Sequence, residues 1–162
     1  MTYPVTYSRL LARELRLDRH GQVALLAGTR LSPEDLGALD QQIDRRDQVT
    51  ILGNALRLAG RPGLGLELGS RLSLAAHGPL GQLLAASANL GEAWAALERF
   101  HGLRVPLVTL SRGFTSTDMV IRLQLQCEPD AVGLFLLEAM VVTIQRGIEL
   151  ILGRRLREGR LE

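Results

Sequence analysis

The spacing of apolar residues predicts helices over most of the first hundred residues. Tyr7, Leu11 and Leu15 recur at helical intervals and predict an amphipathic helix over about 6–17. Glycine and proline mark the gaps between segments, as in Gly60-Arg61-Pro62-Gly63. By the same criterion we expect further helices at about 23–27, from Ser32 onward, and at about 42–59, 64–74, 80–86 and 89–100.

The hydrophobic period changes from 3.6 to 2 after Pro106. Met119, Ile121, Leu123 and Leu125 alternate with mostly polar neighbours, which is typical of a strand with one buried face. Residues 107–111 predict its partner strand, and residues 112–117, which include a glycine, predict the turn. The sequence therefore predicts one small antiparallel sheet, a hairpin at about 107–126.

A long helix is expected at about 130–153, opened by Glu128-Pro129-Asp130. It is apolar nearly all round except for a stripe of Glu138, Gln145 and Glu149, which we expect to face water. Such a pattern predicts a central, largely buried helix. Together these elements predict an α+β fold, predominantly helical, in a single domain over 1–162.

Composition narrows the class of protein. The chain has 162 residues, 46% of them apolar and 22% charged, which is an ordinary globular balance. A single cysteine, Cys127, excludes an internal disulfide and a cysteine-based zinc site. The N-terminus lacks the apolar core of a signal peptide, and the apolar stretch 131–144 is interrupted by Glu138 and too short to span a bilayer. We expect a cytoplasmic protein without a membrane partner.

Charge gives no sign of a nucleic-acid interface. All 19 basic residues are arginines, but the net charge is only +2 and the arginines are scattered. The one local cluster, Arg154, Arg155, Arg157 and Arg160, is typical of a solvated helix end. We therefore expect that this chain alone does not bind operator DNA specifically.

Two glycine motifs resemble ligand loops but favour structural roles. Gly63, Gly65 and Gly69 have the spacing G-x-G-x-x-x-G, without the preceding strand that a dinucleotide site requires. We expect a helix start at Gly63 and close helix packing at Gly65 and Gly69. Gly78-Pro79-Leu80-Gly81 has the spacing of an RNA-clamping loop, but proline stiffens it and no basic residue flanks it, so we expect a tight turn.

The residues that carry most enzyme chemistry are not arranged for it. His20, His77 and His101 have no helical spacing suited to a metal ion. Cys127, just after an apolar strand, is expected to be a small core residue. We therefore expect no enzymatic activity, no cofactor and no metal.

The order of several motifs carries a family resemblance. These motifs are the segments 25–36, 60–69, 78–81, 86–93 and 97–101. Together they resemble the N-terminal regulatory domain of AraC-type bacterial transcriptional regulators, often called arabinose-binding-domain-like. The resemblance implies a cytoplasmic regulator whose N-terminal domain senses a small molecule or self-associates. It also implies a C-terminal helix-turn-helix domain, absent from this chain, through which DNA is bound. The cupin barrel of the arabinose regulator is not expected, because the pattern here is helical.

Two functions follow from this resemblance. The first is effector sensing, in a pocket between the hairpin and the helices around it. Sugar is disfavoured because aromatic residues are few, whereas an amino acid or an amphiphilic acid stays open. The candidate effector-binding residues are Trp94, Phe100, His101 and Phe114, with Arg122 as a partner for an acidic ligand.

The alternative function is a pure dimerisation module without a ligand. Its support is the helix at 131–152, which has more apolar surface than one layer of neighbours covers. An isolated two-stranded hairpin is also marginal in water and leaves open edges. A two-fold homodimer is the expected assembly in either case.

Overall fold

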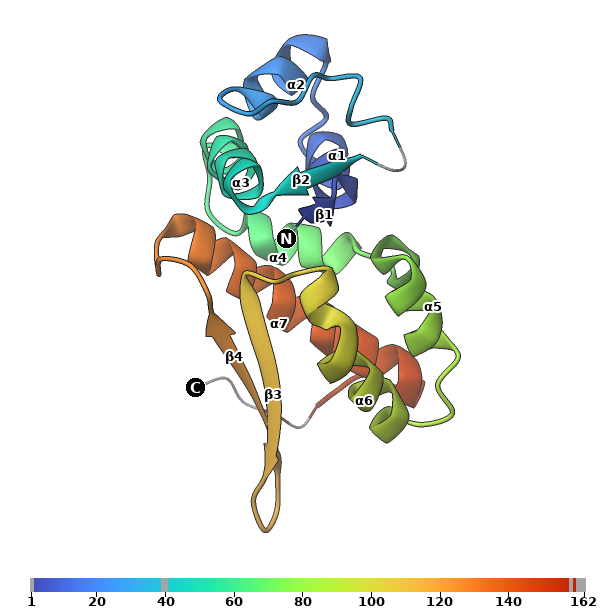
Figure 1. The fold of residues 1–162 in the computed structure, drawn as a ribbon. Helices are drawn as coiled ribbons and strands as arrows, with labels where there is room; N and C mark the ends of the chain where they lie inside the picture. Colours follow the sequence, from blue (N-terminus) through green and yellow to red (C-terminus); the bar gives the residue numbers. More distant parts are fainter. Residues whose placement is uncertain (1, 39–40, 158, 160–162) are drawn as a thin grey trace.

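The computed structural model describes residues 2–38, 41–157 and 159 and is mainly helical (Figure 1). α4 lies between an N-terminal group, made of α1–α3 with a small sheet, and a C-terminal group of α5, α6, α7 and a hairpin (Figure 1). In chain order the elements are β1 Thr2–Pro4, α1 Thr6–Glu14, α2 Arg19–Leu26, β2 Gln42–Asp44, α3 Arg45–Ala59, α4 Leu64–Arg71, the 3₁₀ turn η1 Leu74–His77, α5 Pro79–Ala85, α6 Leu90–Phe100, the 3₁₀ turn η2 His101–Leu103, β3 Val108–Phe114, β4 Met119–Leu125 and α7 Ala131–Leu152.

Most predicted helices are confirmed, and their ends follow local chemistry. Asn89 caps α6 by accepting a hydrogen bond from the Glu92 backbone N–H at 3.0 Å, and the Glu92 carboxylate accepts one from the Ala88 N–H. Gly60 ends α3 in the left-handed region, with φ of 60°. The helices and the short antiparallel strands confirm the α+β class, and the described residues form no closed barrel.

The prediction of one sheet was wrong, because the described residues form two. β1 pairs with β2 in antiparallel register, with Tyr3 opposite Ile43, and both side chains are buried. Each strand has only three residues, which is too short to show an alternating pattern. The helix expected from residue 42 accordingly begins at Arg45.

The helix expected from Ser32 is also absent, and residues 33–37 form turns instead. Ser32 does not cap a helix. Its backbone N–H and its hydroxyl both donate to the Asp35 carboxylate, at 2.7 and 2.9 Å. Leu36 is the one fully buried side chain of this segment, so packing does not favour a longer helix.

The hairpin of β3 and β4 is confirmed, with Val108 opposite Leu125 at its base and Phe114 opposite Met119 at its tip. Inward residues at the base, such as Val108 and Leu110, are buried. The tip projects away from the helices (Figure 1). Within the described residues, neither strand has a second neighbour.

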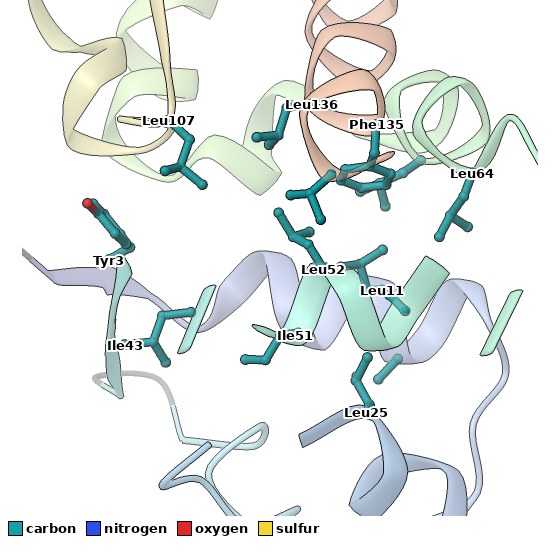
Figure 2. Packing of buried hydrophobic residues seen from close by; sticks show 14 of the residues in the cluster. Tyr3, Leu11, Leu25, Ile43, Ile51, Leu52, Leu64, Leu107, Phe135 and Leu136 are labelled. Atoms are coloured by element: carbon teal, nitrogen blue, oxygen red, sulfur yellow. The ribbon is translucent and has the colours of Figure 1, made fainter. Parts of the chain in front are cut away.

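The main core joins the N-terminal helices to the first half of α7. Figure 2 shows Leu11, Ile51, Leu64 and Phe135 converging from α1, α3, α4 and α7. Cys127 packs half-buried at the edge of this core, as expected, and burial raises the pKa of its thiol. The fully buried residues that α7 contributes to this core therefore all lie in its first half.

The predicted close packing at two glycines is confirmed at the α4–α7 contact. A Cβ atom at Gly65 would lie 2.4 Å from the Phe135 carbonyl oxygen, and one at Gly69 would lie 2.7 Å from that of Ala139. Gly63 precedes α4 with φ of 81°. The glycine motif therefore brings two helix backbones together.

The prediction that α7 is largely buried was wrong for its second half. Its fully buried residues end at Met140, and Leu150 is 64% exposed. Glu138, one of the residues expected to face water, is half-buried against α4 at Gly65, whereas Gln145 is exposed.

By length and composition alone α7 could cross a membrane, but one such helix is weak evidence of a membrane protein, since the core helices of soluble proteins pass the same test. The arginine cluster follows this helix, and Arg160 lies outside the described residues.

Candidate functional site

An apolar cavity lies between α5, α6 and the second half of α7. We call it the α6 cavity; it has a volume of about 670 Å³ including its open mouth. It exists because α7 continues beyond the core while α5 and α6 stand away from it. Its lining residues are Leu74, His77, Leu80, Leu84, Leu90, Ala93, Trp94, Leu97, His101, Arg104, Val105, Met140, Thr143, Ile144, Gly147, Ile148 and Ile151.

A second cavity, the α1 cavity, lies beside the first and has a volume of about 610 Å³ including the solvent space at its mouth. Its walls come from α1, α3, α4 and the first half of α7. The two cavities share a wall made of His77, Arg104, Val105, Met140 and Thr143. This shared wall contains Arg104, the only charged side chain among the described residues that line either cavity.

Three side chains from distant parts of the chain, two of them in the shared wall and Tyr7 in the α1 cavity beside it, form a polar centre. The Tyr7 hydroxyl lies 2.8 Å from Nδ1 of His77, across 70 residues of sequence. The Arg104 guanidinium lies 5.4 Å from the centre of the Tyr7 ring and donates to the Ala76 carbonyl oxygen at 3.3 Å. η1, which begins after α4, and η2, which follows α6, therefore hold His77 and Arg104 against α1.

Burial keeps two of these groups neutral. It raises the pKa of the Tyr7 phenol, with the Arg104 guanidinium acting in the opposite direction. Burial, and secondarily the charge of Arg104, lowers the pKa of His77 from 6.5 to about 4. At neutral pH the centre therefore carries one positive charge, on Arg104.

The turn before α5 places Gly78 next to Arg104. Gly78 has φ of 59°, and a Cβ atom there would lie 3.8 Å from the guanidinium of Arg104. A Cβ at Gly81 would lie 1.6 Å from the Leu74 carbonyl oxygen. The tight turn expected at residues 78–81 is confined to Gly78, because Pro79 already begins α5 and Gly81 lies in the first turn of that helix.

The cavity walls hold buried N–H groups without acceptors. Within the described residues, Nε1 of Trp94, Nε2 of His77 and Nε of Arg104 are buried and have no hydrogen-bond partner. Trp94 is only 2% exposed and His77 only 8%. Buried polar groups are nearly always satisfied, so these atoms are unusual, although Oγ of Ser8, which lines neither cavity, is also buried without a partner.

The charge of Arg104 also lacks a counter-ion in this structure. Among the described residues that line either cavity, none is an aspartate or a glutamate. The ion pairs found in the described part of the chain do not include Arg104. A half-buried cation in an apolar wall is costly without a partner, which favours binding of an anion.

The structure brings together two of the five residues proposed from the sequence. Trp94 and His101 both line the α6 cavity. The ring nitrogens of His101 lie 3.2 Å from the backbone carbonyl oxygens of Leu97 in α6 and Val108 in β3, and the nitrogen that carries the proton donates to its carbonyl. The remaining three residues lie elsewhere.

Phe100, Phe114 and Arg122 do not line the cavity. Phe100 is half-buried, with the Arg99 guanidinium 5.2 Å from its ring centre. Phe114 is 69% exposed at the end of β3, and Arg122 is exposed on β4. The cavity therefore lies between helices, and the strands of the hairpin, where we expected the pocket, do not line it.

Sequence reasoning missed Tyr7 and Arg104 and gave His77 no role. No spacing links these residues, because they meet only when α1, η1 and η2 pack together. The described residues contain no cluster of three or more histidine, cysteine or acidic side chains that could hold a metal ion.

The pKa of His77 predicts a pH-dependent stability. Between pH 6.5 and about 4 the unfolded chain binds a proton on His77 that the folded protein excludes. The free energy of unfolding should therefore fall as pH falls through this window, by about 3 kcal/mol in total. His77→Gln should remove this part of the pH dependence, as measured by urea unfolding at a series of pH values.

His20→Gln is the matched control, because His20 is an exposed histidine. It should leave the pH dependence of unfolding unchanged. If His77→Gln and the unaltered protein lose stability in parallel from pH 6.5 to pH 4, the proposed burial of neutral His77 is incorrect.

Comparison with known proteins identifies the family to which the sequence of this chain is similar. Residues 7–162 match the arabinose-binding domain found at the N-terminus of AraC transcription regulators. The chain is 37% identical over 90 residues, 56% of its length, to the ornithine utilization regulator of Pseudomonas aeruginosa, covering 26% of that protein. It is 28% identical over 144 residues, 88% of its length, to uncharacterized HTH-type transcriptional regulators of Mycobacterium bovis and Mycobacterium tuberculosis, covering 42% of each. The chain thus spans less than half the length of these relatives.

Proposed function

The chain belongs to the family of N-terminal arabinose-binding domains of AraC transcription regulators, and we propose that it senses a small-molecule effector in the α6 cavity. The resemblance seen in the sequence is confirmed. Proteins of this family regulate transcription and are not enzymes. We further propose that the whole regulator acts in the cytoplasm and binds DNA through helix-turn-helix units outside this chain. Relatives more than twice its length that are named HTH-type regulators support this.

The observation that carries effector sensing is the set of buried, unpartnered N–H groups in the cavity walls. A cavity that served only as a packing defect would be lined by apolar atoms alone. Trp94, His77 and Arg104 instead belong to the walls of an apolar cavity and carry buried polar atoms behind its apolar surface, and a few polar side chains in an apolar lining are the usual make-up of a small-molecule site.

The position of the cavity also suits a sensor. Its walls belong to α5, α6 and the second half of α7, which share little packing with the N-terminal core. An effector that fills the cavity would favour the arrangement in which these helices enclose it. We propose that this shift is the signal passed to the rest of the regulator.

The name of one relative suggests ornithine, but this cavity does not suit it. Ornithine carries two ammonium groups at neutral pH, and buried ammonium groups need carboxylate partners. Among the described residues, the cavity lining includes Arg104 and no acidic side chain. We therefore propose a different effector for this chain.

Dimerisation is the second candidate function, favoured by exposed apolar residues. Leu134 and Leu150 on α7 are 58% and 64% exposed, and Phe114 at the hairpin tip is 69% exposed. Apolar surface of this kind often marks a protein contact. The homodimer stays a prediction, and it is compatible with effector sensing.

Thermal unfolding with a small-molecule panel separates the two functions. The panel should contain straight-chain carboxylates, alcohols, amines, amino acids including ornithine, and pentoses. A ligand at a hundred times its Kd stabilises the folded protein by about 2.7 kcal/mol, so an effector would raise the melting temperature by several degrees. If no compound raises it, effector sensing is contradicted.

Light scattering over a range of protein concentrations tests dimerisation separately. A mass that rises above 17.7 kDa with concentration supports it. A mass that stays at the monomer value would contradict it.

A further inference from the structure

Building on the proposed function, we propose that the effector is a monocarboxylate with an apolar chain. Its carboxylate would bind at Arg104, Trp94 and His77, and its chain would lie along the α6 cavity. The argument has three steps, which concern donors, charge and shape.

The first step is that the unpartnered groups are hydrogen-bond donors. The indole N–H of Trp94 and the Nε–H of Arg104 can only donate. Tyr7 keeps its proton and faces the donor-only guanidinium of Arg104, so its hydroxyl donates to Nδ1 of His77. A neutral histidine that accepts at Nδ1 carries its proton on Nε2. The unmatched groups in the walls are therefore N–H donors that a ligand reaches only when neighbouring side chains shift, and the matching ligand group is an acceptor without protons.

The second step is that the site carries one positive charge. Arg104 is the only charged residue among the described residues lining the α6 cavity, because His77 is neutral at physiological pH. A group with a single negative charge balances it. A phosphate monoester carries close to two negative charges at neutral pH and would leave one buried without a partner. A carboxylate fits both the charge and the donors.

The third step is the shape and polarity of the remaining lining. Away from Arg104 the walls are aliphatic, with Leu80, Leu84, Leu97, Ile144 and Ile148 among them. They offer nothing that would bind hydroxyl groups of a sugar or the ammonium group of an amino acid. An aliphatic chain attached to the carboxylate would be stabilised by the apolar surface that it buries.

Three probes that share one chain test the head group: octanoate, 1-octanol and octylamine. The sole tryptophan of the protein, Trp94, lines the cavity, so its fluorescence reports binding directly. We expect octanoate to bind at least about tenfold more tightly than 1-octanol, since charge-assisted hydrogen bonds distinguish the two. Octylamine should bind most weakly, because it brings a second positive charge to Arg104.

Arg104→Gln should weaken octanoate binding at least about tenfold and leave 1-octanol binding unchanged. Arg99→Gln is the matched control, because Arg99 is an exposed arginine outside the cavity lining. It should leave the binding of both probes unchanged. The comparison of octanoate with 1-octanol uses the unaltered protein. It therefore tests the preference for a carboxylate even if the Arg104→Gln variant does not fold.

The outcomes separate this inference from the proposed function. Equal binding of octanoate and 1-octanol, or tightest binding of octylamine, would overturn the carboxylate and leave effector sensing in place. The same holds if another panel member binds and no octyl probe does. If no compound changes either the fluorescence or the melting temperature, both proposals are overturned.

Discussion

Gly65→Ala is expected to destabilise the protein by about 3 kcal/mol or more, because the added methyl group has no room between α4 and α7. Its Cβ would lie 2.4 Å from the Phe135 carbonyl oxygen and 2.7 Å from Cβ of Glu138. Neither atom can move away without shifting the backbone of α7. Because α7 supplies a wall of both cavities, the substitution should also weaken any ligand binding there. Urea unfolding followed by circular dichroism measures the change.

Gly53→Ala provides a matched control with the opposite expected sign. Gly53 lies inside α3, and the nearest atom to its added Cβ would be the mobile end of Arg57 at 3.8 Å. Alanine in a helix interior is favoured over glycine by about 0.5–1 kcal/mol, so this variant should be slightly more stable than the unaltered protein. Equal effects of the two substitutions would contradict the close helix contact at Gly65.

Trp94→Ala is expected to cost about 3–5 kcal/mol through lost burial and an enlarged cavity. Trp94 is 2% exposed and lines the α6 cavity from α6, so its ring is part of the packed wall as well as of the candidate site. Urea unfolding followed by far-ultraviolet circular dichroism is the suitable measurement, since the variant removes the only tryptophan.

Trp94→Phe separates the ring from its N–H group. It keeps an aromatic side chain and removes a donor that has no acceptor in this structure. We expect it to cost less than half as much stability as Trp94→Ala. It should nevertheless weaken octanoate binding, measured by the shift in melting temperature. A Trp94→Ala variant that loses less than about 1 kcal/mol would show that the ring is not part of the packed wall.

Local chemistry predicted the helices well. Asn89 and Asp130 cap α6 and α7 with their own side chains, and Gly60 ends α3 by its left-handed backbone. These signals act within one turn of helix, so they are readable in the sequence. The alternation of residues 119–125 was equally readable and located β4 correctly.

The candidate site was only partly predictable. Trp94 and His101 were predicted from the sequence to line an effector pocket, and both line the α6 cavity. Their role in effector binding stays a prediction. Tyr7 and Arg104 carried no signal, because a lone tyrosine or arginine on a helical pattern is usually an ordinary surface or core residue. Only the packing of α1 against η1 and η2 makes them neighbours of His77.

The sequence by itself determined the family, the α+β class and the close packing of α4 at Gly65 and Gly69, since capping residues, hydrophobic period and small residues act over short distances along the chain. Tertiary structure alone decided the pairing of β1 with β2, the exposure of the second half of α7, and the polar centre between the two cavities. The physical reason is that burial and charge pairing depend on which segments meet. Tyr7, His77 and Arg104 each look ordinary in sequence, and only their shared burial leaves N–H groups and a positive charge without partners.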